Sequence, residues 1–265
     1  MSLRIQNNVE ALTAHRSLNQ TSDKIAKSME RLSSGYRINR AADDAAGLSI
    51  SERMRSQING LAQAGRNIQD GVSMVQTAEG NLDEVHSMLQ RVRELAVQYK
   101  NGTLSTDDQN AIQTEVNQLA SEIERIGSSA KFNGITLLAS SGAVTFQVGV
   151  NDGETILVST ISLGSTVGAF STLSGASSIS AIDAAISAVS SARATFGAVQ
   201  NRLEHSMAST QVYAENLTAA ESRVRDVDMA AEMVQLTKNQ ILQQAGTSML
   251  AQANQAPQSI LSLIR

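Results

Sequence analysis

The chain contains 265 residues, has neither cysteine nor tryptophan, and carries a formal net charge of −4. The absence of cysteine excludes disulfides and thiolate metal sites, and the weak negative charge gives no general attraction for nucleic acid or an acidic membrane surface. Only three tyrosines and four phenylalanines are present. This composition disfavours a deep ligand pocket and favours close packing of helices through aliphatic side chains.

The charge is uneven along the chain, because residues 1–40 carry a net +4 and the remainder therefore carries −8. Two interpretations stay open: a solvated helix face, or a basic arm that docks on another segment. The first 30 residues contain no apolar core of the signal-peptide type, and no stretch approaches a membrane span. We therefore expect no membrane insertion and, if the protein leaves the cell, an export route that does not use a cleaved hydrophobic leader.

Residues 3–33 have the apolar spacing of a helix. Their apolar residues form two seven-residue series that are one residue out of phase: Ile5 and Leu12, then Leu18, Ile25 and Leu32. The resulting stripe is imperfect, and we expect such a lone stripe to stay loose in the isolated chain and to become ordered only on assembly.

Residues 34–46 are a connector, because Gly35 breaks the helical pattern. Asp43 and Asp44 close this connector, where carboxylates stabilise the positive end of a following helix. A catalytic carboxylate pair is the alternative interpretation. Nothing nearby supplies a partner acid, base or metal ligand, so a helix-capping role is favoured.

Residues 48–99 are predicted to form one helix about 80 Å long at about 1.5 Å per residue. Apolar residues recur there every seven positions: Met54, Leu61, Ile68, Val75, Leu82, Leu89 and Ala96. A second row follows four residues after each of the first five: Ile58, Gly65, Val72, Glu79 and His86. This spacing predicts a long stripe for helix packing, which suggests an elongated, assembling protein rather than an enzyme.

A further helix is predicted after residues 105–109, where Thr106 and Gln109 resemble the two ends of a capping box. Asn133-Gly134 marks a turn. Apolar residues then alternate through residues 143–163 around Asn151-Asp152-Gly153, which predicts a β-hairpin. Residues 162–180 are rich in Ser, Thr, Gly and Ala and are expected to form a surface loop.

The helical pattern returns near residue 181 and continues to an apolar tip that includes Leu261 and Leu263. An exposed apolar terminus is typical of a partner surface. The predicted fold is mainly α: an elongated antiparallel helical bundle or coiled coil with long helices, one small β-hairpin, and paired amino- and carboxy-terminal helices.

Several segments resemble bacterial flagellins. Residues 31–50 resemble the amino-terminal signature of that family, and residues 90–98 resemble its second signature. Similar matches occur over residues 132–138, over the hairpin at 147–155, and in the tail at 220–228 and 256–265. Each match alone is weak, but together they cover nearly the whole chain except about 164–180.

The resemblance implies a structural subunit that polymerises into the helical flagellar filament for swimming motility. Residues 1–33 and 229–265 would form an inner terminal-helix domain, 34–46 a connector, and 47–228 a helical rod that includes the hairpin and the surface loop. Self-assembly would use apolar residues of both termini. These are Ile5, Val9, Leu12, Leu18, Ile25 and Leu32 with Val234, Ile241, Ala245, Met249, Leu261 and Leu263.

The resemblance also implies partners: copies of the chain itself, an export chaperone, and the cap and hook-junction proteins of the flagellum. The chain would lie outside the cell, exported through the flagellar type III apparatus. Arg91, Leu95 and Glu115 match residues that contact the flagellin-sensing Toll-like receptor of a host, although packing between subunits is an equally strong role for them. Only residues 162–180 occupy the place of the outer domains of longer flagellins, so a thin, smooth filament is expected.

Alternatives remain from other classes of protein. A hook–filament junction protein shares the terminal helices, and a non-flagellar coiled-coil scaffold would explain the seven-residue spacing but not the series of motifs. An enzyme has no support, because His15, His86 and His205 are scattered and lack metal-binding spacing. We expect no catalytic residue, no metal and no cofactor. Glycosylation of residues 162–180 is left open.

Overall fold

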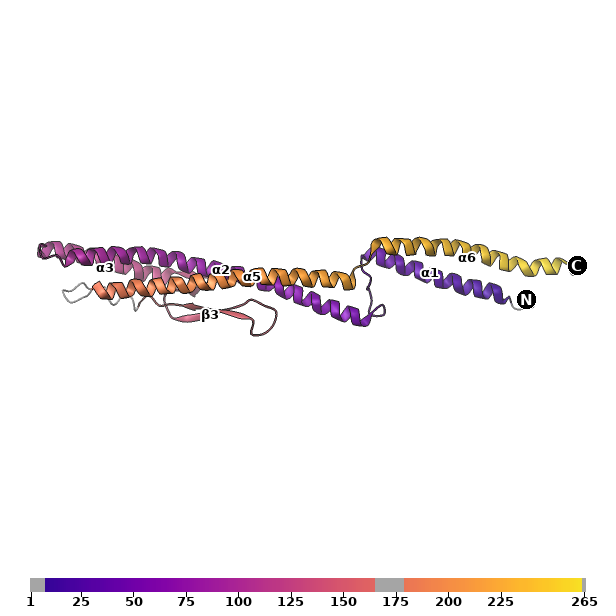
Figure 1. The fold of residues 1–265 in the computed structure, drawn as a ribbon, viewed down its shortest axis with the longest axis horizontal. Helices are drawn as coiled ribbons and strands as arrows, with labels where there is room; N and C mark the ends of the chain where they lie inside the picture. Colours follow the sequence, from indigo (N-terminus) through magenta and orange to yellow (C-terminus); the bar gives the residue numbers. More distant parts are fainter. Residues whose placement is uncertain (1–7, 165–178, 264–265) are drawn as a thin grey trace. The chain divides into compact units, whose positions relative to one another are not determined.

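The computed structural model describes residues 8–164 and 179–263, and side chains only as far as residue 255. It divides into two compact units, one made of Met1–Ser56 with Leu217–Arg265 and the other of Gln57–Asn216. The two boundaries between the units, after Ser56 and after Asn216, lie inside long helices. The long-helix prediction is confirmed, since α2 spans Ala45–Tyr99, and α5 spans Ile179–Arg225 (Figure 1). No helix in the described part is long and apolar enough to cross a membrane.

The core of the Gln57–Asn216 unit is formed by α2, α3 (Thr106–Ser129) and α5. The first predicted row is buried from Leu61 to Ala96, as expected, whereas Met54 is half-buried. The second predicted row is wrong by one residue. The buried companions lie three residues after the first row instead of four: Ala64, Gly71, Ala78, Val85 and Val92.

The shifted row has a simple cause. Positions three and four residues away are both neighbours on a helix surface, and the choice depends on which side chains can lose water. Glu79 and His86 occupy the predicted row and are only half-buried. Charged and ring-nitrogen groups are costly to bury without partners, so the helix turns the Ala, Gly and Val row inward instead.

The amino-terminal end of α3 is capped one residue earlier than predicted. Ser105 has an extended ψ of 164° and is therefore the residue that precedes the helix. Its Oγ accepts from the Asp108 backbone N–H at 3.2 Å, and the Asp108 carboxylate accepts from the Ser105 N–H at 3.1 Å. The capping box thus uses Ser105 and Asp108, not Thr106 and Gln109.

The predicted hairpin is confirmed: β3 (Gly142–Gln147) pairs antiparallel with β4 (Thr155–Thr160), with Val144 opposite Val158 and Phe146 opposite Ile156. Alternate residues of β4 are buried against the helices. The Asn133-Gly134 turn is also confirmed, since both residues have positive φ (46° and 81°). It joins two short strands that the sequence did not reveal, β1 (Lys131–Phe132) and β2 (Ile135–Thr136).

Gly71 lets the hairpin approach α2 closely. A Cβ atom at this position would lie 3.3 Å from both Leu203 Cδ1 and Phe146 Cγ. We expect Gly71→Leu to lower the free energy of unfolding by about 1–3 kcal/mol, because the added side chain overpacks the core. Gly80→Leu is the matched control, since a Cβ there meets nothing within 4 Å. Urea unfolding of the two variants should separate them, and equal stability would contradict the packing shown here.

The other unit contains the two terminal helices, α1 (Val9–Ser34) and α6 (Met229–Leu263), which pair antiparallel (Figure 1). Both segments are helical in the structure, and their looseness in the unassembled chain stays a prediction. Each helix covers one side of the other. This mutual burial offsets part of the conformational entropy lost when the helices become ordered, which the apolar stripe of one helix alone could not offset. Residues 165–178, which make up most of the predicted surface loop, lie outside the described residues.

Candidate assembly surface of the terminal helices

The seam between α1 and α6 is narrow and rich in small and polar residues. Leu18 Cδ1 lies 3.4 Å from the position of a Cβ on Gly246, and Asn8 Nδ2 donates to the Ala253 carbonyl at 2.7 Å. The least exposed positions recur every three or four residues along both helices. They are Ala11, Ala14, Leu18, Thr21, Ile25 and Ser28 on α1, and Glu232, Leu236, Asn239, Gln243, Gly246 and Leu250 on α6.

The predicted assembly residues divide between this seam and the opposite, outward faces. Leu18, Ile25 and Leu32 are half-buried. Val9, Leu12, Val234, Ile241, Ala245 and Met249 are exposed, with 70% of Val234 and 60% of Ile241 accessible to solvent. Ile5 and the side chains of Leu261 and Leu263 lie outside the described residues.

The phase change noticed in the amino-terminal stripe explains this division: Leu12 precedes Leu18 by six residues, so the two cannot lie on one face of a helix. The sequence did not reveal that α6 meets α1 through Leu236, Asn239 and Gly246 rather than through Val234 and Ile241. Each terminal helix carries more than one row of residues that could face its partner. The spacing in the sequence does not show which row is buried, because contacts with the other helix decide that.

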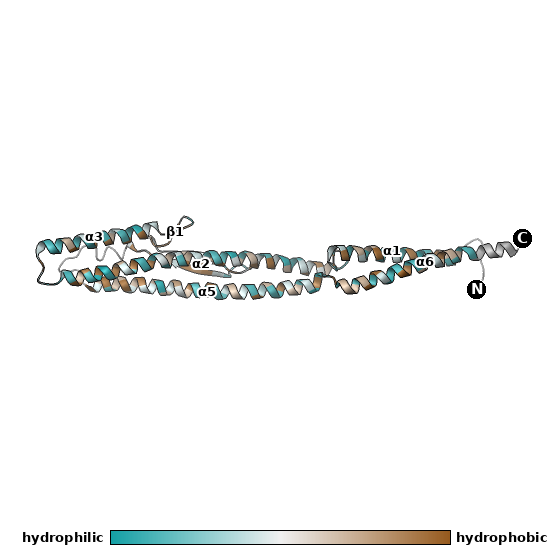
Figure 2. Ribbon diagram, turned by 90° about the horizontal axis from the view of Figure 1, so that it is seen from above, coloured by the Kyte–Doolittle hydropathy of each residue, from teal (hydrophilic) through white to brown (hydrophobic). Residues whose placement is uncertain are grey.

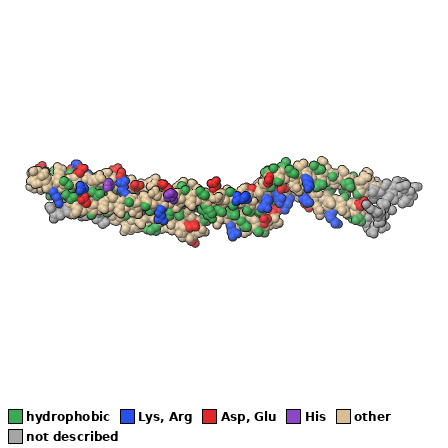
Figure 3. Space-filling view, in the orientation of Figure 1, with side chains coloured by type: hydrophobic (Ala, Val, Ile, Leu, Met, Phe, Trp, Pro, Cys, Tyr) green, Lys and Arg blue, Asp and Glu red, His purple; other side chains and the backbone are tan. Residues whose placement is uncertain are grey.

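The outward faces form two shallow apolar grooves. One is lined on α6 by Met233, Val234, Lys238, Ile241 and Leu242. The other is lined by Val9 and Thr13 of α1 with Met249 and Ala253 of α6. Figure 2 shows hydrophobic residues recurring along both helices, and Figure 3 shows apolar side chains at the surface of this pair. Sequence reasoning missed three exposed apolar residues of α6: Met229, Met233 and Leu242.

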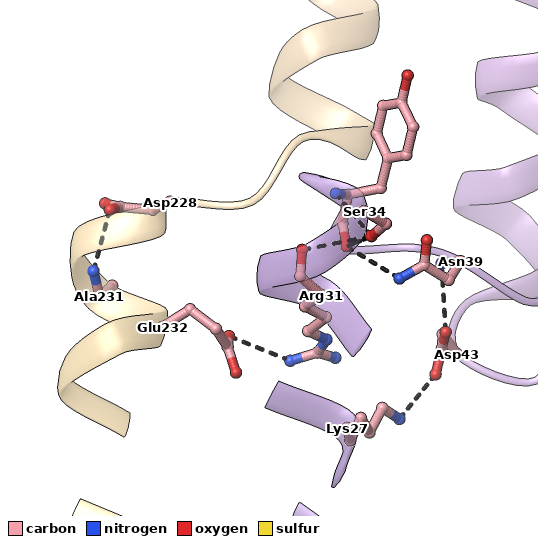
Figure 4. A network of polar contacts seen from close by, with 9 residues as sticks. Lys27, Arg31, Ser34, Asn39, Asp43, Asp228, Ala231 and Glu232 are labelled. Carbon is pink, nitrogen blue, oxygen red and sulfur yellow. Dashed lines mark hydrogen bonds and ion pairs between the residues drawn. The ribbon is translucent and has the colours of Figure 1, made fainter. Parts of the chain in front are cut away.

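Polar contacts hold the connector against the terminal helices (Figure 4). Lys27 Nζ lies 2.7 Å from Asp43 Oδ1, and the other carboxylate oxygen of Asp43 accepts from the backbone N–H groups of Asn39 and Arg40. The hydrogen bond from Lys27, followed by that from the Arg40 backbone, lowers the pKa of Asp43 to about 2. Asp44 Oδ1 accepts from the Gly47 N–H at the start of α2. Asp44 therefore has the capping role that the sequence favoured, whereas Asp43 does not cap α2 and instead ties the connector to Lys27 of α1.

Asp43 makes the unit of the terminal helices sensitive to acid. Because its folded-state pKa lies below the ordinary value of 3.8, the contact stabilises the fold above about pH 4 and is lost as pH falls through about 2. Asp43→Asn should therefore be less stable than the unmodified chain at pH 7, and the difference should shrink as pH falls through about 2. Thermal melts between those pH values measure the difference. Asp23→Asn, an exposed position on α1, should show no such convergence.

Arg225 joins the end of α5 to the start of α2 and to the connector. Its guanidinium, only 13% exposed, donates to Glu52 Oε1 at 2.7 Å and lies 4.8 Å from the centre of the Tyr36 ring. Ser51 Oγ donates to Glu221 Oε1. The Arg37 N–H bonds to the Arg225 carbonyl. These contacts tie both connecting segments together where α1 ends and α6 begins.

The three residues proposed for receptor contact are only partly grouped. Arg91 and Glu115 face each other on α2 and α3, with Arg91 Nε and Nη2 at 3.0 and 2.9 Å from Glu115 Oε1, and both side chains are exposed. Hydrogen bonding to Glu115, then to Glu94, raises the pKa of Arg91. Leu95 is 2% exposed and belongs to the core. In the single chain Leu95 therefore packs within the subunit, whereas the sequence analysis offered packing between subunits.

The histidines do not form a site in the described part of the chain. His15 pairs with Asn19 and His86 with Gln90 on their own helices, and His205 is exposed. Among the described residues, no group of three or more His, Asp or Glu side chains could hold a metal ion.

Comparison with known proteins identifies the family. The model of the bacterial flagellin N-terminal helical region matches residues 5–143, and that of the bacterial flagellin C-terminal helical region matches residues 179–264. The chain belongs to the bacterial flagellin family. The first match includes α1 and the second includes α6, the two helices that carry the apolar outward faces. Flagellins are structural proteins.

Individual flagellins match over nearly their full length. A flagellin of Halalkalibacterium halodurans is 51% identical, over 98% of this chain and 99% of that protein. A flagellin of Bacillus subtilis is 44% identical, over 99% of this chain and 100% of that protein. The crystal structure of Bacillus cereus flagellin aligns with a TM-score of 0.51 and 31% identity, covering 59% of this chain and 94% of that one. A junction protein or a non-flagellar scaffold is therefore not favoured.

Proposed function

We propose that this flagellin is the subunit of a helical flagellar filament and that the outward faces of α1 and α6 hold neighbouring subunits together. The observation that carries the proposal is the row of exposed apolar side chains on these faces, which includes Val9, Val234, Ile241 and Met249. Exposed apolar surface of this extent is typical of an interface. Flagellar filament core proteins of Treponema match the chain over 98% of its length.

Burial of these faces against other copies would drive polymerisation, by about 25 cal/mol for each Å² of apolar surface removed from water. The groove on α6 differs from the groove that α1 and α6 line together. Contacts between unlike surfaces repeat head to tail, and they generate a helical array when the rotation between subunits does not close into a ring. In this proposal, Leu18, Ile25 and Leu32 hold the pair together within a subunit, and the exposed residues hold subunits to one another.

The remaining assignments belong to the same proposal, and the resemblance to flagellins supports them. Residues 1–33 and 229–265 form the inner domain of the filament, 34–46 the connector, and 47–228 the surrounding rod. The chain has a structural role, lies outside the cell in the filament, and meets an export chaperone and the cap and hook-junction proteins. Arg91 and Glu115 are the residues of the receptor motif that a host receptor could reach, and Leu95 supports them from within.

Seeded growth tests the proposal. The full chain and a chain that lacks residues 1–30 are added to filament seeds and examined by electron microscopy. The full chain should elongate the seeds, whereas the shortened chain, which retains only the last turn of α1, should not. Growth of the shortened chain into normal tubes would remove α1 from the assembly surface, and failure of the full chain to grow would refute the filament role.

A further inference from the structure

The chain contains three Asn-Gly pairs: Asn59-Gly60, Asn101-Gly102 and Asn133-Gly134. An asparagine followed by glycine readily loses its side-chain amide, because glycine has no side chain to hinder the approach of its backbone nitrogen to the asparagine side chain. The sequence alone therefore gives three equal candidates for this reaction. The structure places the three pairs in three different backbone environments, and these environments decide which pair reacts.

The first pair, Asn59-Gly60, is protected because it lies inside α2. Within a helix the Gly60 N–H is bonded to the carbonyl four residues earlier, so its nitrogen cannot turn toward the Asn59 side chain unless the helix opens. Packing adds to this restraint, since a Cβ atom on Gly60 would lie 2.9 Å from Val150 Cγ1. Asn59 is exposed to solvent, but its neighbour is fixed.

The pair Asn133-Gly134 is protected by the turn that it forms. Phe132 pairs with Ile135 across this turn, and the φ values of Asn133 and Gly134 are 46° and 81°. Both values lie in the left-handed region that a two-residue turn between strands requires. The Gly134 nitrogen reaches the Asn133 side chain only if the Asn133 backbone rotates, and this rotation breaks the pairing of β1 with β2.

The pair Asn101-Gly102 lies in the loop between α2 and α3, and both residues are exposed. In the described structure neither the Asn101 side-chain amide nor the Gly102 N–H has a hydrogen-bond partner. The Asn101 N–H donates to the Gln98 carbonyl, but this contact precedes the backbone bond that must rotate. The Leu104 N–H lies 3.3 Å from the Asn101 carbonyl oxygen, which is long for such a bond. The Gly102 nitrogen is therefore the freest of the three to approach its asparagine.

We propose that Asn101 is a site of spontaneous deamidation through a cyclic imide. The Gly102 nitrogen, after giving its proton to hydroxide, forms a bond to Asn101 Cγ. The bond from Cγ to Nδ2 breaks, and the side-chain nitrogen leaves as ammonia. Water then opens the imide at either of its two carbonyl groups and leaves aspartate or isoaspartate at position 101. Water and hydroxide are the only co-reactants, and nothing is oxidised or reduced.

Either product changes the end of α2. The new carboxylate lies at the carbonyl end of this helix, where negative charge is unfavourable. Tyr99 and Leu104 lie on the two sides of the Asn-Gly pair and pack against the core, and isoaspartate adds a backbone carbon between them. An aged chain therefore carries an additional negative charge and a less firmly held loop. This inference does not depend on the proposed filament role.

Ageing of the full chain in dilute, mildly alkaline solution tests the site. Samples are digested at mildly acidic pH, where the reaction is slow, and mass spectrometry measures the fraction converted at each pair. Asn101 should convert at least about tenfold faster than Asn59 and Asn133, which corresponds to about 1.4 kcal/mol in activation free energy. In guanidinium chloride, which removes the helix and the turn, the three pairs should convert at similar rates.

Gly102→Leu is the matched variant, because a Cβ at this position meets nothing within 4 Å and the φ of Gly102 is not positive. It should slow the conversion of Asn101 to the rate of the protected pairs and leave Asn133 unchanged. An isoaspartyl methyltransferase should label position 101 in the aged unmodified chain and not in this variant.

Three results would overturn the proposal. Equal rates at the three pairs in the folded chain would show that the loop gives Asn101 no additional freedom. Conversion of Asn101 in guanidinium chloride but not in the folded chain would show that the loop protects it. Formation of aspartate without isoaspartate would show direct hydrolysis of the side-chain amide rather than a cyclic imide.

Discussion

Replacing Ile241 with Asp should abolish elongation of filament seeds while leaving the fold of the single chain intact. Ile241 is 60% exposed on α6 and lines the outward apolar groove, so the single chain loses little from the change. In the polymer the lost burial of an isoleucine, about 1.5–3 kcal/mol, raises the critical concentration about 10- to 100-fold. Burial of an unpaired carboxylate adds to this cost.

The measurement is seeded growth followed by light scattering, with circular dichroism of the dilute chain to check the fold. Gln240→Asp serves as the control, because it places the same charge at the adjacent exposed position, outside the groove. A normal critical concentration for Ile241→Asp would show that this face of α6 stays open in the filament.

Leu89→Ala should lower the free energy of unfolding by about 2–5 kcal/mol, the usual range for truncating a buried leucine. Leu89 is fully buried within the core formed by α2, α3 and α5. Val97→Ala, on an exposed position of the same helix, should change the stability by less than about 0.5 kcal/mol. Urea unfolding monitored by circular dichroism compares the two, and a similar loss for both would contradict the burial pattern of α2.

The sequence predicted the helices and the hairpin because their signals are local. Seven-residue spacing in α2, alternation in β3 and β4, and the Asn133-Gly134 turn each depend on neighbours within one element. The rows that face inward could not be predicted in the same way. Whether Ala78 or Glu79 is buried depends on the two helices that pack against α2. The residues of those helices lie elsewhere in the chain.

The sequence predicted apolar residues of the assembly surface. It did not predict which of them lie between α1 and α6 and which lie on the outward faces. Val234, Ile241 and Met249 follow an apolar row in the sequence, and the structure exposes that row. The sequence suggested the same row for the contact with α1. The structure instead uses a row that contains Asn239 and Gly246. This row is more polar than expected for a contact between helices, and the ion pair of Arg31 with Glu232 lies along the same contact. Arg31 and Glu232 are 201 residues apart in the chain, so their contact produces no periodic pattern in the sequence.

Family resemblance supplied what periodicity could not: the filament, its motility role and the place of the terminal helices. The structure adds the physical reason, since one side of each terminal helix is covered by the other and the remaining apolar side is not. It also separates the receptor motif into an exposed ion pair, Arg91 with Glu115, and a core residue, Leu95.

Labelling of Val234→Cys in free chains and in filaments tests the central claim most directly. The claim is that the outward face of α1 and α6 is accessible in a single chain and becomes covered by other copies. Maleimide should modify position 234 rapidly in dilute chains and at least about a hundredfold more slowly in filaments, as expected for a residue at the centre of an interface. Equal labelling in the two states would show that the apolar face does not hold the subunits together.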